Sequence, residues 1–62
     1  MTMIYCVLDH EYPCLVIDDR RAYWFDDGRW KEMHVADTVY NAGVIGKAAF
    51  DERFGPLPKP PR

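Results

Sequence analysis

The chain has 62 residues, a formal net charge of −2, an apolar content of 48% and an aromatic content of 15%. This length allows one domain with one small core, and the aromatic content argues against a disordered chain. The Lys and Arg residues form no basic stripe of the kind that binds nucleic acid, and no apolar run approaches the ~20 residues of a membrane span.

The N-terminal pattern indicates a cytoplasmic protein. The apolar run at residues 3–8 is much shorter than the hydrophobic region of a signal peptide, and no basic segment precedes it. In the cytoplasm, Cys6 and Cys14 are expected to remain reduced.

The first half of the chain predicts short strands joined by turns. Met3–Leu8 (MIYCVL) is apolar on both faces, which predicts a central strand or one covered on both sides. The polar segment 9–13 contains a proline and reads as a turn. Cys14–Ile17 is the second predicted strand, and the charged segment 18–21 is the turn that follows it.

Asp27-Gly28 marks the centre of the strongest hairpin signal in the sequence. It lies between the apolar, aromatic third strand, which starts at Ala22, and a fourth strand that runs from Arg29 or Trp30 to Val35. A type I′ turn there requires positive φ at both central residues. This turn sets four cross-strand pairs, namely Asp26 with Arg29, Phe25 with Trp30, Trp24 with Lys31, and Tyr23 with Glu32.

The segment after the strands predicts a helix. Asp37 is its expected N-cap, and the helix is expected to end where Arg53 occupies the last turn, Gly55 the C′ position and Pro56 blocks continuation. Seven small or apolar residues would share its sheet-facing side, namely Val39, Ala42, Gly43, Gly46, Ala49, Phe50 and Phe54.

Two glycines weaken that helix, because each costs about 1 kcal/mol relative to alanine in a helix interior. An alternative is a break near residues 41–43, which would leave a short helical turn and a second helix over Val44–Phe54. The fold class expected is α+β: a small antiparallel β-meander of three to four strands followed by one C-terminal helix packed on the sheet. Residues 1–55 form this domain, and residues 56–62 form an extended, proline-rich tail.

The metal-ligand residue types are Cys6, His10, Cys14 and His34, which could in principle satisfy tetrahedral zinc. Their spacing lacks a C-x-x-C element, so we expect no metal and read the cysteines as small buried hydrophobes. A disulfide between Cys6 and Cys14 would need a three-residue loop at residues 9–11, and such loops favour a glycine that is not there. No nucleophile elbow, phosphate loop or zinc-protease motif occurs, so we expect neither catalysis nor a cofactor.

Acidic residues recur in pairs at the three predicted turns. The pairs are Asp9/Glu11, Asp18/Asp19 and Asp26/Asp27. Alternate turns of a meander lie at the same end of a sheet, so the first and third turns would gather four carboxylates. Such a group can imitate backbone phosphates and speed the encounter with a basic groove. The alternative is that turns favour Asp for local hydrogen bonds, while neighbouring arginines neutralise part of the field.

The aromatic residues exceed what one small face can bury. We expect some of them on the surface, where Trp and Tyr are the usual interface anchors. The alternative is that the helix and the tail cover them all. The residues concerned are Tyr12, Tyr23, Trp24, Phe25, Trp30 and Tyr40.

The short length, the acidic turns at Asp18-Asp19 and Asp26-Asp27, the aromatic run Tyr23-Trp24-Phe25 and the lack of a catalytic motif occur together. In this general character the chain resembles the small inhibitors that phages and other mobile elements encode, anti-CRISPR proteins among them. The resemblance implies a protein in the bacterial cytoplasm that binds a CRISPR-Cas effector subunit and blocks target-DNA binding or cleavage. A net charge of −2 is milder than DNA mimics of this type usually carry.

Two functional hypotheses follow. The first is a non-enzymatic, protein-binding inhibitor of a nucleic-acid-handling complex such as a CRISPR-Cas effector, with no direct binding to nucleic acid or membrane. The second is a small structural or regulatory homodimer, or an accessory subunit, that associates through the aromatic sheet face. The first hypothesis predicts these partner-binding residues: Asp9, Glu11, Asp18, Asp19, Asp26, Asp27, Tyr23, Trp24 and Trp30.

Overall fold

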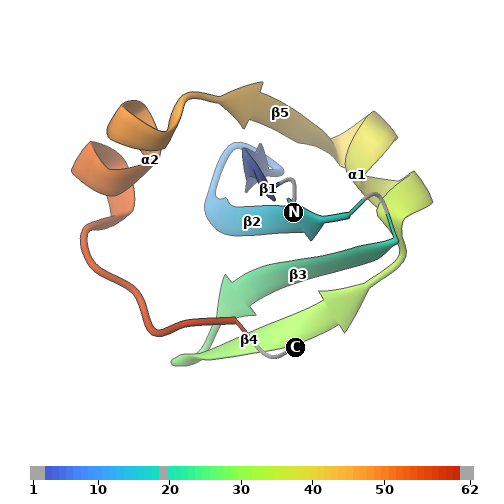
Figure 1. Ribbon diagram of the computed structural model, residues 1–62, viewed down its shortest axis with the longest axis horizontal. Helices are drawn as coiled ribbons and strands as arrows, with labels where there is room; N and C mark the ends of the chain where they lie inside the picture. Colours follow the sequence, from blue (N-terminus) through green and yellow to red (C-terminus); the bar gives the residue numbers. More distant parts are fainter. Residues whose placement is uncertain (1–2, 19, 61–62) are drawn as a thin grey trace.

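The computed structural model describes residues 3–18 and 20–60. In this part of the chain, five strands form one antiparallel sheet in the order β4-β3-β2-β1-β5, accompanied by two helices (Figure 1). The elements are β1 (Met3–Leu8), β2 (Tyr12–Ile17), β3 (Arg21–Asp26), β4 (Arg29–Met33), α1 (Val35–Asn41), β5 (Ala42–Ile45) and α2 (Lys47–Phe54). The predicted α+β class is confirmed, and β1 has the predicted bounds and lies inside the sheet, between β2 and the edge strand β5.

The hairpin of β3 and β4 has the turn and register that the sequence predicts. Asp27 and Gly28 both have positive φ, at 54° and 78°, as a type I′ turn requires. All four predicted cross-strand pairs occur, including Phe25 opposite Trp30. The rings of that pair lie 5.1 Å apart at 68°, an edge-to-face contact that stabilises the hairpin end.

The other strand boundaries differ from the prediction by one or two residues. β2 begins at Tyr12 and contains Pro13, which pairs with Val7 of β1. Pro13 fits there because the pairing with β3 begins only at Cys14, so β2 has a strand on one side at that point. β4 ends at Met33, two residues before the predicted end, because Val35 already begins α1.

The prediction of a single C-terminal helix is wrong. The segment instead forms α1, then a fifth strand, β5, and then α2 (Figure 1). The predicted alternative, a break near residues 41–43, identified the right place, but it included no strand. Gly43 and Gly46 disfavour a continuous helix, and β-branched Val44 and Ile45 suit a strand once β1 offers them a free edge.

The predicted N-cap is also wrong. His34 occupies the N-cap position of α1 without a side-chain capping hydrogen bond, and Asp37 lies within the first turn, where its backbone N–H donates to the His34 carbonyl at 3.0 Å. The helix starts earlier because Val35 packs against the buried cluster of the sheet. The predicted end of the second helix is confirmed: Arg53 is in the last turn of α2, and Gly55 has φ 72° and donates to Asp51. Neither helix in the described residues is long and apolar enough to cross a membrane.

Alternation along the strands gives the sheet two buried faces. The first face carries a cluster that α1 helps to cover through Val35, and this cluster consists of Cys6, Leu8, Cys14, Val16 and Ala22. The second face presents Tyr5, Leu15 and Tyr23, and α2 covers it through Phe50, which is only 4% exposed. The Phe50 ring lies 5.1 Å from the ring of Tyr5. The predicted seven-residue helix face does not form, because the chain spanning it is split among three elements.

Candidate partner-binding surface

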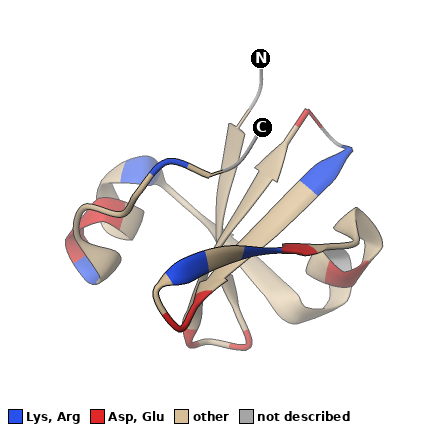
Figure 2. Ribbon diagram, turned by 90° about the horizontal axis from the view of Figure 1, so that it is seen from below, with Lys and Arg blue, Asp and Glu red and all other residues tan. Residues whose placement is uncertain are grey.

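Two hairpins carry acidic residues at the same end of the sheet (Figure 2). The β1–β2 turn carries Asp9 and Glu11, while Asp26 ends β3 and Asp27 follows it in the β3–β4 turn. Both turns lie at the same end because β2 and β3 are neighbouring antiparallel strands, with Cys14 opposite Trp24. We call these four residues the acidic end.

Backbone geometry holds the acidic end in place. In the β1–β2 turn the N–H of Glu11 donates to the Leu8 carbonyl at 2.9 Å, and the N–H of Asp9 donates to the Asn41 carbonyl at 2.8 Å. Asp9 and His10 take positive φ, at 51° and 62°, without any glycine in the turn. The carboxylates therefore stand on two short, hydrogen-bonded loops rather than on flexible connections.

Most of these carboxylates are free to meet a partner. Asp26 forms an ion pair with Lys31 at 3.1 Å, and both side chains are about one-third exposed. Asp9, Glu11 and Asp27 are exposed, and no ion pair joins them to another described residue. Exposed pairs contribute about 0–1 kcal/mol to stability. The acidic end therefore adds little to folding stability.

Two basic side chains limit the negative field of this surface. Arg29 follows the β3–β4 turn and is exposed, and Arg53 of α2 donates a hydrogen bond to the backbone carbonyl of His10. The surface is thus negative at its centre and bordered by cations. This pattern suits docking in one orientation better than long-range attraction alone.

The remaining predicted acidic residues do not join the acidic end. Asp18 lies at the opposite end of the sheet, in the β2–β3 turn, with its carboxylate 3.8 Å from the Arg21 guanidinium. Its φ of 56° places it in the left-handed region. Asp19 lies outside the described residues.

The predicted aromatic anchors take part in the protein's own packing. Tyr23 is 5% exposed on the second face. Trp24 is half-buried on the first face, where its ring lies 5.1 Å from Tyr12 and 5.2 Å from the Lys31 ammonium. Trp30 is half-buried and donates its indole N–H to the carbonyl of Pro58 at 2.8 Å. The three predicted anchors are therefore buried or half-buried, and their rings make contacts within the protein.

One aromatic residue does lie on the surface, beside the free edge of β5. Tyr40 at the end of α1 is 86% exposed, and Val44 of β5 is 74% exposed. Among the described strands β5 pairs only with β1, and its sequence AGVI has no charge and no proline. The opposite edge strand, β4, carries Arg29, Lys31 and Glu32. Charges protect an edge against pairing with other chains, so β5 is the less protected edge.

The two cysteines lie directly opposite each other on β1 and β2, because the β1–β2 loop does have the three residues that this register needs. Asp9 and His10 supply the left-handed conformations for which a glycine was expected.

Both cysteines are free thiols. A hydrogen bond from Cys14 lowers the pKa of Cys6, although burial opposes this shift. Donating that hydrogen bond, burial and the nearby Cys6 charge all raise the pKa of Cys14. Within residues 3–18 and 20–60, no group of three His, Cys, Asp or Glu side chains is placed to hold a metal.

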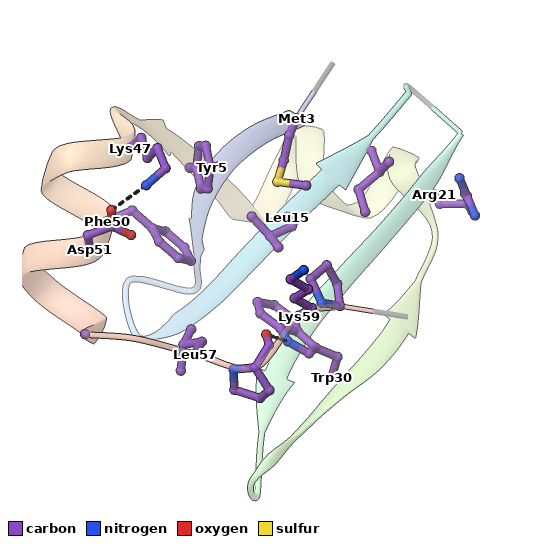
Figure 3. A pocket seen from close by; sticks show the side chains of 14 residues that line it. Met3, Tyr5, Leu15, Arg21, Trp30, Lys47, Phe50, Asp51, Leu57 and Lys59 are labelled. Atoms are coloured by element: carbon purple, nitrogen blue, oxygen red, sulfur yellow. Dashed lines mark hydrogen bonds and ion pairs between the residues drawn. The ribbon is translucent and has the colours of Figure 1, made fainter. Parts of the chain in front are cut away.

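A pocket that the sequence analysis missed lies over the second face of the sheet (Figure 3). Its volume is about 770 Å³, and its floor comes from the strands, including Tyr5, Leu15 and Trp30. α2 forms one wall with Phe50, and the proline-rich tail forms another. The apolar pattern of the strands could have indicated this second buried face, but the position of the tail has no local signal.

Comparisons of the chain with protein-family models, with curated proteins and with solved structures gave no match.

Proposed function

We propose that this protein is a non-enzymatic inhibitor that binds a basic surface of a nucleic-acid-handling complex, such as a bacterial CRISPR-Cas effector, through its acidic end. The observation that carries the proposal is the gathering of Asp9, Glu11, Asp26 and Asp27 on two neighbouring turns, with three of these carboxylates outside any described ion pair. The protein would act in the cytoplasm of the bacterial host, where such complexes work.

Physical chemistry supports this use of the acidic end. Carboxylates on a fixed frame present acceptor oxygens to Lys and Arg, which make charge-assisted hydrogen bonds to them. Electrostatic attraction raises association rates by about 10–10³-fold when potentials are complementary. Arg29 and Arg53 at the border would disfavour partners whose basic surface is broader than the acidic end.

The proposal is tested by affinity capture of the tagged protein from a bacterial lysate that contains an active CRISPR system. We expect an effector subunit to be recovered with the wild-type protein, and its recovery to fall roughly tenfold for the Asp9→Asn/Asp27→Asn double variant. Both positions have positive φ, which asparagine tolerates, so the turns should be preserved.

The matched control is Glu32→Gln/Asp37→Asn, which changes the net charge equally at exposed positions that lie with Arg20 of the β2–β3 turn, away from the acidic end. It should capture the partner as well as the wild type does. Equal recovery by all three proteins, or recovery of the tagged protein alone, would contradict the proposal.

A second candidate function is a structural or regulatory homodimer, and the free edge of β5 favours it. An antiparallel pairing of two β5 strands would satisfy the unpaired backbone groups and would bring Tyr40 and Val44 toward the partner copy. This edge replaces the aromatic sheet face as the surface for self-association, since α2 and the tail cover that face.

Sedimentation velocity tests this candidate. The homodimer form predicts a concentration-dependent dimer that Val44→Lys converts to a monomer, because a lysine on an edge strand opposes pairing. Glu32→Lys on the opposite edge strand is the control, and it should leave the dimer intact. A wild-type monomer at every concentration would remove this candidate.

A further inference from the structure

The proline-rich tail has a conformation that its sequence largely fixes. Each residue from Pro56 to Pro60 is either a proline or directly precedes one. Proline fixes its own φ and pushes the preceding residue into the extended region, so the segment is restricted to the polyproline II conformation. Such a segment has no internal hydrogen bonds, and its carbonyl groups remain available as acceptors.

The protein's own sheet binds this tail. Gly55, with φ 72°, ends α2 and turns the chain back toward β4 (Figure 1). The indole N–H of Trp30 then donates to the Pro58 carbonyl at 2.8 Å, across 28 residues of sequence. Leu57, Pro58 and Pro60 line the same pocket as Trp30 (Figure 3).

These contacts have the chemistry by which proteins recognise proline-rich peptides. Such sites use an aromatic groove for the proline rings and a side-chain donor for the backbone carbonyls. Trp30 supplies a group that donates but cannot accept, which matches a segment rich in carbonyls and poor in N–H groups. The pocket also extends past the tail to Tyr5 and Phe50, so the groove is longer than the contact at Pro58.

We propose that this groove is a binding site for an extended, proline-rich segment of another protein, and that the chain's own tail occupies it when that partner is absent. The partner segment would resemble residues 56–60, with prolines separated by single residues. It would displace the tail and take over the hydrogen bond from Trp30. This site lies on the second face of the sheet and does not depend on the function proposed for the acidic end.

The tail competes with any such partner. A tethered segment acts at an effective concentration on the order of millimolar. The apparent affinity of an added peptide is therefore the intrinsic affinity of the open groove multiplied by the fraction of molecules in which the groove is open. Weakening the tail without altering the groove should therefore raise the affinity for the peptide. If the tail only covers the sheet, weakening it should not raise the affinity for the peptide.

The test uses the full chain with nitrogen-15 in its two Trp indoles and an added peptide of sequence GPLPKPP. In the wild type the peptide would replace the hydrogen bond between Trp30 and the tail with an equivalent one, so the shift is measured in Leu57→Asp, whose charge weakens tail docking. There we expect the peptide to shift the indole N–H signal of Trp30 but not that of Trp24, which lies on the other face and serves as an internal reference. Calorimetric titration with the same peptide should show an apparent affinity at least about tenfold higher for Leu57→Asp than for the wild type. The peptide GALAKAA is the matched control and should shift neither signal.

Three results would overturn the inference. The first is an unmoved Trp30 signal in Leu57→Asp at peptide concentrations on the order of millimolar. The second is an equal shift with the alanine peptide. The third is a Trp30 signal that changes with protein concentration alone, which would assign the groove to the tail of a second copy.

Discussion

Replacing Gly28 with valine is expected to lower the free energy of unfolding by about 2 kcal/mol. Gly28 has φ 78° in the type I′ turn that sets the register of β3 and β4. A left-handed backbone brings Cβ too close to the following carbonyl, and a β-branched side chain worsens this contact. Thermal unfolding should show the melting temperature falling by roughly 10 °C for a domain of this size.

The control for this substitution is Gly43→Ala in β5. No atom lies within 4 Å of a Cβ placed at either glycine, so crowding does not separate the two sites. Gly28 alone of the two has φ in the left-handed region. The control should therefore stay within about 0.5 kcal/mol of wild type. Equal melting temperatures for the two variants would show that the turn does not require its backbone conformation.

Replacing Phe50 with alanine should have the largest effect, at about 3–5 kcal/mol. Phe50 is the one residue of α2 that is buried, and its ring lies 5.1 Å from both Tyr5 and Phe54. An isolated helix as short as α2 is unstable in water, so its docking depends on this side chain. Urea unfolding gives the loss in free energy, and hydrogen exchange shows whether α2 detaches before the sheet unfolds.

Ala49→Ser is the matched control, because Ala49 is the exposed neighbour of Phe50 in the same helix. Its unfolding free energy should remain within about 0.5 kcal/mol of wild type. If Phe50→Ala were as stable as this control, the result would contradict the packing of α2 on the second face through Phe50.

Local sequence signals predict the part of the fold that local chemistry determines. Asp27-Gly28 between aromatic runs predicted a turn type, a register and four cross-strand pairs, because few sequences place two positive φ values between strands. Arg53 and Gly55 likewise predicted the end of α2, because helix termini have strong residue preferences.

The elements that depend on distant partners were not predictable in the same way. Residues 42–45 form β5 because the free edge of β1 accepts them, and a four-residue apolar run does not indicate its partner. The hydrogen bond between Trp30 and Pro58 joins two segments with no common pattern. The turn at residues 9–11 was unexpected because Asp9 and His10, rather than a glycine, adopt positive φ.

The acidic end was predictable from the sequence only in part. Its four carboxylates could be placed at one end of the sheet, since alternate turns of a meander must lie together (Figure 2). The ion pair of Asp26 with Lys31 and the position of Arg53 beside the β1–β2 turn depend on tertiary packing. The positions of the cations that border the surface could therefore be predicted only partly from the sequence.

The ionic-strength dependence of binding tests the proposed role of the acidic end most directly. The measured quantity is the association rate of the captured partner with the wild-type protein and with Asp9→Asn/Asp27→Asn, from ~0.01 M to ~1 M salt. Over that range the Debye length falls from about 30 Å to about 3 Å. The proposal predicts a steep fall for the wild type and a clearly shallower one for the variant. Identical salt dependence for the two proteins would contradict it.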